Sequence, residues 1–237
     1  MGWYGLVAEN DDKPICIMER GEYYHKMAKS NKKKAPPSKV NEEDYIKVSV
    51  NEDWLQNSAG KKHYDEDFYR IIDFYVLHSP CKVSSYTPRT LESMGWKNAW
   101  NSSIFRDTFD SVAGFVEGDT LRFGKSKSSF LNMWNDTGYT SFWGQGKEFA
   151  VYTYVGESNP RLDLLHHIRN SFAHGRFASQ GLNKEVFLYF EDVTEINKLK
   201  GLYASARICL KKTTLIEWLD IFEKKSEKAE KMKSLYS

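Results

Sequence analysis

The stretch Leu164–Phe177, LLHHIRNSFAHGRF, combines apolar residues with two arginines, an asparagine and three histidines. Successive residues of a helix rotate by about 100°, so positions four apart lie nearly above one another. His166, Asn170 and His174 therefore form one polar stripe, and Arg169 flanks it. The apolar residues in the neighbouring directions are Leu164, Leu165, Ile168 and Phe172. We expect these apolar residues to anchor the helix in the core and to leave the stripe facing a cleft or a partner subunit.

Both ends of this helix are marked in the sequence. The segment 156–160, GESNP, supplies a turn with a proline near a helix start. Gly175 is the residue type most often found just past a helix end. The pattern therefore predicts a helix from about Arg161 to His174 that stops at Gly175.

Arg169 and His174 have complementary chemistry for reactions at phosphate. An arginine stays charged at physiological pH and can donate two parallel hydrogen bonds to a phosphate. A histidine titrates close to neutral pH and can accept and return a proton. In RNA the 2′-hydroxyl lies beside the scissile phosphate, so a base and a stabilising cation suffice for cleavage. The expected products are a 2′,3′-cyclic phosphate and a 5′-hydroxyl, with no cofactor.

The other polar residues of the stretch are candidates for catalysis or for binding. We expect Asn170 to belong to the catalytic group with Arg169 and His174. Arg176, His166 and His167 are candidates for contacts with RNA or phosphate. A zinc site from the histidines is not expected, because adjacent histidines point in different directions and no cysteine or carboxylate cluster completes four ligands.

Outward from this helix, periodicity predicts a mixture of helices and strands. Apolar spacing of three and four residues predicts helices over 64–79, 102–116 and 128–135, and from Thr213 to the charged C-terminal tail. Runs rich in β-branched and aromatic residues predict strands over 13–20, 45–50 and 148–155, and an antiparallel pair at 185–192 and 203–210. The glycine-containing segment 136–147 is predicted to be a loop. No boundary is strong enough to divide the chain, so we expect a single domain over 1–237, with a β-containing region at 1–60.

Composition narrows the functional class. The 237 residues carry a formal net charge of only +2, so any affinity for nucleic acid must be local. The three cysteines, Cys16, Cys81 and Cys209, are widely spaced and suit a reducing compartment. The N-terminus lacks a secretory pattern, and no run approaches the roughly 20 apolar residues of a membrane span. We therefore expect a cytoplasmic protein that does not enter a membrane.

The segment HIRNSFAHGRF resembles the R-x(4–6)-H signature of the HEPN superfamily (higher eukaryotes and prokaryotes nucleotide-binding). Arg169 matches the arginine of that signature, Asn170 the polar residue that commonly follows it, and His174 the histidine. The order of a hairpin and then the helix that contains KKTTLIEWLDIF is similar to a plasmid- and phage-associated subgroup. The resemblance covers roughly Val151 to Lys225.

This resemblance implies a fold and a function. The fold would be α+β but mainly helical: a HEPN-like helical bundle over 61–237, with accessory strands, a hairpin before the C-terminal helix, and the motif at 161–177. The activity would be that of a metal-independent endoribonuclease, a toxin or anti-phage effector with RNA as substrate. A homodimer would form a composite site from two copies of the helix, and an antitoxin or other protein could regulate it.

Two other functions fit the same residues. One is a noncatalytic module that binds RNA, a nucleotide or a protein partner through the polar helix end. The other is a structural protein of a phage or mobile element. The two residues also have a purely structural interpretation, in which His174 interacts with the helix dipole and Arg169 pairs with Asp163 or Glu157.

Overall fold

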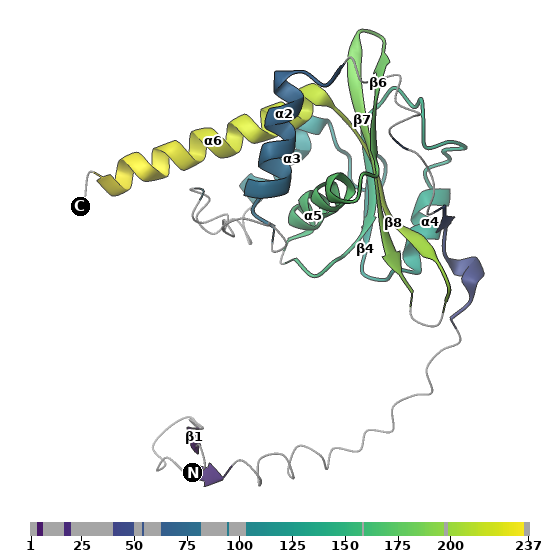
Figure 1. The fold of residues 1–237 in the computed structure, drawn as a ribbon, viewed down its shortest axis with the longest axis horizontal. Helices are drawn as coiled ribbons and strands as arrows, with labels where there is room; N and C mark the ends of the chain where they lie inside the picture. The colour runs from purple at the N-terminus through teal and green to yellow at the C-terminus, as the bar shows by residue number, and fades with distance from the viewer. Residues whose placement is uncertain are drawn as a thin grey trace. The chain divides into compact units, whose positions relative to one another are not determined.

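The computed structural model describes residues 4–6, 17–19, 40–49, 54, 63–81, 94, 103–157, 159–196 and 199–234. The chain divides into two compact units, Met1–Lys39 and Val40–Ser237. In the first unit, β1 (Tyr4–Leu6) pairs with β2 (Ile17–Glu19) in antiparallel fashion. Most of the predicted strand over 13–20 lies outside the described residues. The second unit contains the motif helix (Figure 1).

A six-stranded mixed sheet forms the middle layer of the second unit. Its strands follow the order β4-β5-β8-β7-β6, and β3 pairs with β8. Only the β4–β5 pairing is parallel among those described. The strands are β3 (Lys47–Val48), β4 (Leu121–Gly124), β5 (Phe149–Thr153), β6 (Phe177–Leu182), β7 (Glu185–Glu195) and β8 (Leu202–Lys211).

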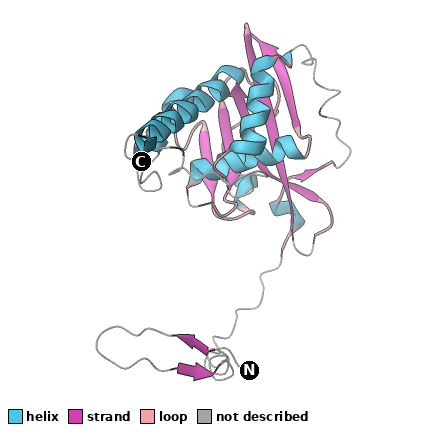
Figure 2. Cartoon of the chain, turned by 60° about the vertical axis from the view of Figure 1, so that its left-hand side comes forward, coloured by secondary structure: helices cyan, strands magenta, loops and turns pink. Residues whose placement is uncertain are grey.

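Helices cover the sheet on both faces. The motif helix α5 (Pro160–Ala173) packs on one face, and α4 (Ser129–Asn135) lies on the other, as Figures 1 and 2 show. The face of α5 also carries α2 (Glu66–Ile72), which continues as the π-helical segment η3 (Asp73–His78), together with α3 (Ser103–Ala113) and α6 (Lys212–Ser234). A short 3-10 turn, η1 (Glu42–Asp44), precedes β3.

The sequence of β7 explains why the sheet has two cores. Successive side chains of a strand point to opposite faces. Leu188 and Phe190 belong to the core under α5, whereas Phe187 and Tyr189 belong to the core on the α4 side. The strand is therefore apolar on both faces over this stretch, as expected for a strand inside a layered domain.

Most of the helix and strand predictions are confirmed. The predicted helices 64–79, 102–116 and 128–135 correspond to α2 with η3, to α3 and to α4. Asp65 caps α2 by accepting a hydrogen bond from Phe68 N at 3.1 Å. The predicted strand at 148–155 and the antiparallel pair at 185–192 and 203–210 appear as β5, β7 and β8.

The predicted helical bundle is wrong. The strands are not accessories to a bundle, because β5, β7 and β8 form the centre of a mixed sheet on which α5 packs. Two of its strands, β4 and β6, were not predicted. Each carries a glycine and a charged or polar residue within a short run, LRFG and FASQGL, so the local β signal is weak. Their pairing with β5 and β7 forms them.

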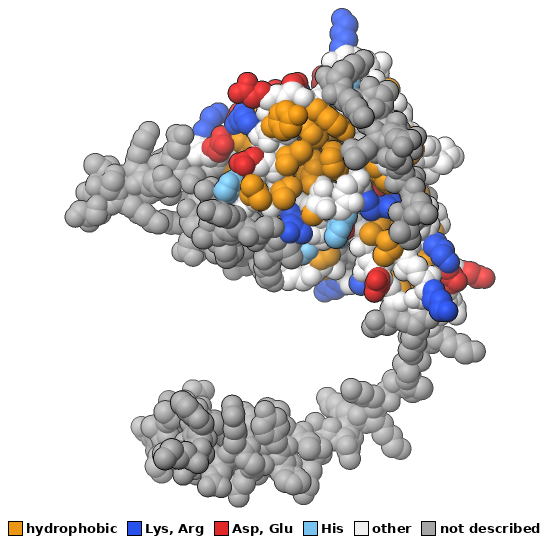
Figure 3. Space-filling view, in the orientation of Figure 1, with side chains coloured by type: hydrophobic (Ala, Val, Ile, Leu, Met, Phe, Trp, Pro, Cys, Tyr) orange, Lys and Arg blue, Asp and Glu red, His pale blue; other side chains and the backbone are white. Residues whose placement is uncertain are grey.

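The surface beside α5 has an apolar area. Figure 3 shows apolar side chains gathered on the side of the molecule where α2 and α5 lie. Tyr69 on α2 is 63% exposed, and Leu77 on η3 is 37% exposed.

No helix among the described residues combines the length and the apolar character of a membrane span.

Candidate functional site

The start of α5 is tied to the loop that follows β5. Asn159 caps the helix by accepting a hydrogen bond from Arg161 N at 2.8 Å, and Pro160 opens the first turn. Asp163 Oδ1 accepts hydrogen bonds from the backbone N–H groups of Val155 and Glu157, both at 3.0 Å. Burial raises the pKa of the Asp163 carboxyl, and the two N–H groups oppose that rise. The position of α5 along the sheet is fixed here.

The end of α5 is a Schellman motif. Gly175 adopts φ +66°, its N–H donates to Phe172 O at 3.1 Å, and Arg176 N donates to Ser171 O at 2.8 Å. The predicted stop at Gly175 is confirmed. His174 is the C-cap residue and is exposed. The motif therefore places an exposed imidazole at the carboxyl end of a helix, where the helix dipole favours a cation.

His167 is the buried polar centre of α5. Its side chain is 0% exposed, with Nε2 2.7 Å from the carbonyl oxygen of Thr153 and Nδ1 2.7 Å from Asp192 Oδ2. Thr153 ends β5, and Asp192 lies on β7. The imidazole thus joins the helix to two strands of the sheet.

Asp192 lies at a β-bulge. Asp192 is paired with Ala206 and Val193 with Ala204, so Ser205 is the extra residue on β8. A bulge twists the strand locally and re-aims a side chain. Asp192 Oδ1 accepts a hydrogen bond from Val193 N at 2.9 Å, which leaves Oδ2 directed at α5.

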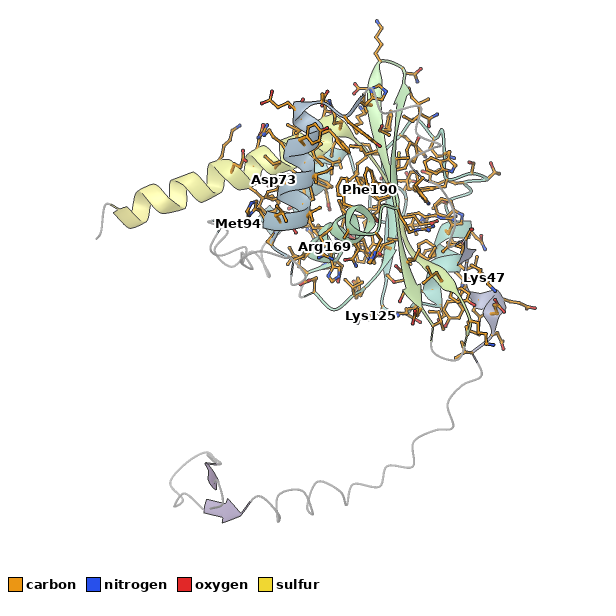
Figure 4. The ribbon with its side chains drawn as sticks, in the orientation of Figure 1. Lys47, Asp73, Met94, Lys125, Arg169 and Phe190 are labelled. Carbon is orange, nitrogen blue, oxygen red and sulfur yellow. The ribbon has the colours of Figure 1, made fainter. Side chains whose placement is uncertain are left out.

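The same carboxylate is linked to the motif residues. Asn170 Nδ2 donates to Asp192 Oδ2 at 3.3 Å, and Arg169 Nη1 donates to Asn170 Oδ1 at 3.1 Å. Figure 4 labels Arg169 on α5 and Phe190 on the strand beneath it. A hydrogen-bonded path therefore runs from the buried His167 through Asp192 and Asn170 to Arg169.

The predicted polar stripe becomes more exposed along the helix. His166 is 12% exposed, and its Nδ1 lies 3.1 Å from Glu157 Oε1. Asn170 is half-buried and His174 is exposed. The stripe is thus a real feature of α5, but only its carboxyl end lies at the surface, whereas His166 and His167 are engaged with carboxylates.

Arg176 is not brought together with Arg169. Because Glu191 and Asp192 are neighbours on β7, their side chains face opposite sides of the sheet. Arg176 pairs with Glu191, donates to Ser49 O at 3.1 Å, and lies over the ring of Trp54. Its guanidinium is therefore buried on the face away from α5, and the structure does not bring this candidate for RNA or phosphate contact together with Arg169.

A second arginine completes this cluster. Arg207 Nε donates to Glu191 Oε2 at 2.9 Å, and its guanidinium lies 4.7 Å from the centre of the Trp134 ring. One buried carboxylate therefore serves two arginines. We describe Arg176, Glu191 and Arg207 as the arginine–glutamate cluster.

Sequence reasoning missed Asp192 as a partner of the motif. The sequence did contain a signal. Leu188, Phe190 and Asp192 are alternate residues of one strand and therefore face the same side of the sheet, and the first two are buried apolar residues. A carboxylate at an inward position of a buried strand requires donors. Its donors could not be named, because they lie 22 and 25 residues earlier in the chain.

The described residues contain no group of three or more His, Cys, Asp or Glu side chains placed to hold a metal ion.

Comparison with protein-family models, with curated proteins and with solved structures finds no match to this chain. The function must therefore be argued from the site itself.

Proposed function

We propose that this chain is a metal-independent endoribonuclease whose active site lies at the carboxyl end of α5. The observation that carries the proposal is the path His167–Asp192–Asn170–Arg169, which fixes a guanidinium on the same helix end as the exposed His174. Fixed donors at a site of developing negative charge are the main source of catalysis for phosphate transfer.

Each residue of this site has a distinct role. His174 takes the proton from the ribose 2′-hydroxyl, and the 2′-oxygen attacks the adjacent phosphorus. Arg169 stabilises the negative charge on the phosphorane oxygens as the bond to the 5′-oxygen breaks. Asn170 holds Arg169 through its amide oxygen. The proton that His174 removed is returned to the leaving 5′-oxygen, so that the products are a 2′,3′-cyclic phosphate and a 5′-hydroxyl.

One α5 supplies one arginine and one histidine, and we propose that a second copy of the chain completes the site. Apposition of two α5 ends would bring two Arg169 and two His174 side chains together and concentrate positive charge at the cleft. Such local charge is consistent with a chain whose net charge is only +2. The likeness of the helix to the HEPN signature supports this arrangement and a role as a toxin or anti-phage effector under the control of a regulatory protein.

The test is an RNA cleavage assay with the full chain in EDTA. We expect cleavage to products with 2′,3′-cyclic phosphate and 5′-hydroxyl ends, and its loss in Arg169→Ala and in His174→Ala. The matched controls are Arg106→Ala and His63→Ala. Arg106 lies on α3 with a side chain that is 51% exposed, and the His63 side chain lies beside Gly181 of β6. Both controls should cleave as the wild type does.

Cleavage that survives both Arg169→Ala and His174→Ala would refute the assignment. RNA binding without any cyclic-phosphate product, weakened by the same two variants, would instead identify a noncatalytic RNA-binding module at this helix end.

A further inference from the structure

The two contacts of His167 require two protons. The Thr153 carbonyl oxygen can only accept, so Nε2 must donate to it at 2.7 Å. A neutral imidazole then has no proton on Nδ1, yet Nδ1 lies 2.7 Å from a carboxylate oxygen. A second proton therefore lies between His167 and Asp192, on one of the two residues.

The surroundings of Asp192 favour the ionised carboxylate. Its Oδ1 accepts from Val193 N at 2.9 Å, and its Oδ2 faces both Asn170 Nδ2 and His167 Nδ1. Hydrogen bonds from several N–H donors stabilise the charged form of a carboxyl group. The second proton is then on His167, and the pair is an imidazolium and a carboxylate.

Other groups around His167 are compatible with this assignment. The Tyr152 ring on β5 lies 5.7 Å from the imidazole, and burial raises the pKa of its hydroxyl well above the ordinary value, so it stays neutral. On α5, Asp163 interacts electrostatically with His167, and the His166 ring lies 6.4 Å away. Among the described residues, two acidic groups therefore interact with His167: Asp192 on β7 and Asp163 on its own helix.

The carboxylate also determines which way the Asn170 amide points. Because Asp192 Oδ2 only accepts, Asn170 must direct Nδ2 toward it and Oδ1 toward Arg169. A donor at position 192 would favour the opposite amide orientation, with an N–H group facing the guanidinium. Arg169 would then lose this acceptor.

We propose that His167 and Asp192 form a buried imidazolium–carboxylate pair that acts as a positioning device, orienting the Asn170 amide and through it Arg169. Neither residue of the pair touches RNA in this scheme. The effect of the device on cleavage rests on the proposed function, whereas the proton on His167 and the orientation of the amide do not.

The direct test is nitrogen NMR of the full chain labelled at histidine and asparagine, with His167 assigned through His167→Gln. We expect both ring nitrogens of His167 to give signals of protonated nitrogen at neutral pH. In Asp192→Asn, one of the two should become unprotonated, and the side-chain amide signals of Asn170 should shift. Glu195→Gln, an exposed position on the same strand, is the matched control and should change neither.

Moving the carboxylate from position 192 to position 170 distinguishes a positioning role of Asp192 from a role in stability alone. In Asp192→Asn, kcat for RNA cleavage should fall by roughly tenfold or more, as for loss of a residue that orients an active-site group, with little change in KM. In the double variant N170D/D192N, the carboxylate at 170 again accepts from Arg169 and also accepts from the amide at 192. Cleavage should recover in the double variant, while His167 keeps a single ring proton.

Two results would refute the imidazolium–carboxylate pair: a single protonated ring nitrogen on His167 in the wild type, or unchanged His167 and Asn170 signals in Asp192→Asn. A double variant no better than Asp192→Asn would also remove the positioning role. If the wild type shows the doubly protonated His167 but cleaves no RNA, the pair is upheld and the proposed function fails. The two claims are therefore tested separately.

Discussion

At the scale of single residues, the end of α5 depends on the backbone conformation of Gly175. Its φ of +66° lies in the left-handed region, which side chains with a Cβ disfavour. A Cβ built on Gly175 meets no atom within 4 Å, so the cost of a substitution comes from the backbone alone. The Schellman motif that exposes His174 therefore relies on this glycine.

We expect Gly175→Ala to lower the free energy of unfolding by about 1–2 kcal/mol, the usual cost of a left-handed alanine. Urea denaturation of the purified protein measures the change. Gly175→Asn is the control, since asparagine tolerates this conformation better, and its loss should be smaller. Equal losses in the two variants would contradict the backbone explanation.

A second residue-scale prediction concerns Asp163. Burial raises the pKa of its carboxyl above the ordinary 3.8, so the folded state binds this proton more tightly than the unfolded state does. The protonated Asp163 carboxyl therefore contributes to the stability of the fold at low pH. This contribution is lost as the pH rises through the pKa of the carboxyl in the folded state. Asparagine at this position keeps the Oδ1 acceptor for Val155 N and Glu157 N and removes the buried charge.

The stability of Asp163→Asn relative to the wild type should thus increase as the pH rises from about 4 to about 7. Denaturation curves of the two proteins at several pH values provide the comparison. A stability difference that stays constant over this range, or that moves in favour of the wild type, would show that folding does not raise the pKa of the Asp163 carboxyl.

At the scale of elements, β7 organises both faces of the sheet. Asp192 contacts His167 of α5 on one face, and Glu191 forms ion pairs with Arg176 and Arg207 on the other. Adjacent acidic residues in one strand therefore have unrelated partners, which the alternation of side chains requires. The arginine–glutamate cluster lies on the α4 side of the sheet, whereas the neighbouring carboxylate of Asp192 contacts residues of the candidate site on α5.

We expect Glu191→Gln to destabilise the fold by about 3–5 kcal/mol, because two buried guanidinium groups lose their shared counter-charge. Chemical denaturation checks the magnitude. Glu195→Gln, exposed near the end of the same strand, should differ little from the wild type. A loss below about 1 kcal/mol in Glu191→Gln would mean that solvent or another group compensates the arginines.

At the scale of the whole molecule, the proposed site needs a second chain. If Arg169 of one copy acts with His174 of the other, an inactive Arg169→Ala protein and an inactive His174→Ala protein should regain cleavage when they are mixed and allowed to exchange subunits. Size-exclusion chromatography with light scattering should show a dimer in each preparation. A monomeric wild type that cleaves RNA, or a mixture as inactive as its parts, would contradict a shared site.

The sequence by itself determined the elements whose signals are local. The caps around 161–175, the acidic start of α2 and the apolar runs of β7 and β8 are read within a few residues, and the structure places these elements as predicted. The polar stripe on α5 followed from the helix period in the same way.

The tertiary structure decided everything that depends on distant pairing. Strands β4 and β6 have weak local signals and exist through their neighbours in the sheet. Asp192 reaches His167 and Asn170 only because a bulge and the packing of α5 on β7 direct it there. Arg176, two residues from His174 in the chain, is buried on the opposite face because the chain turns at Gly175 and enters the sheet. Spacing along a sequence sets the direction of a side chain within its own helix or strand, whereas its partners depend on how those elements pack.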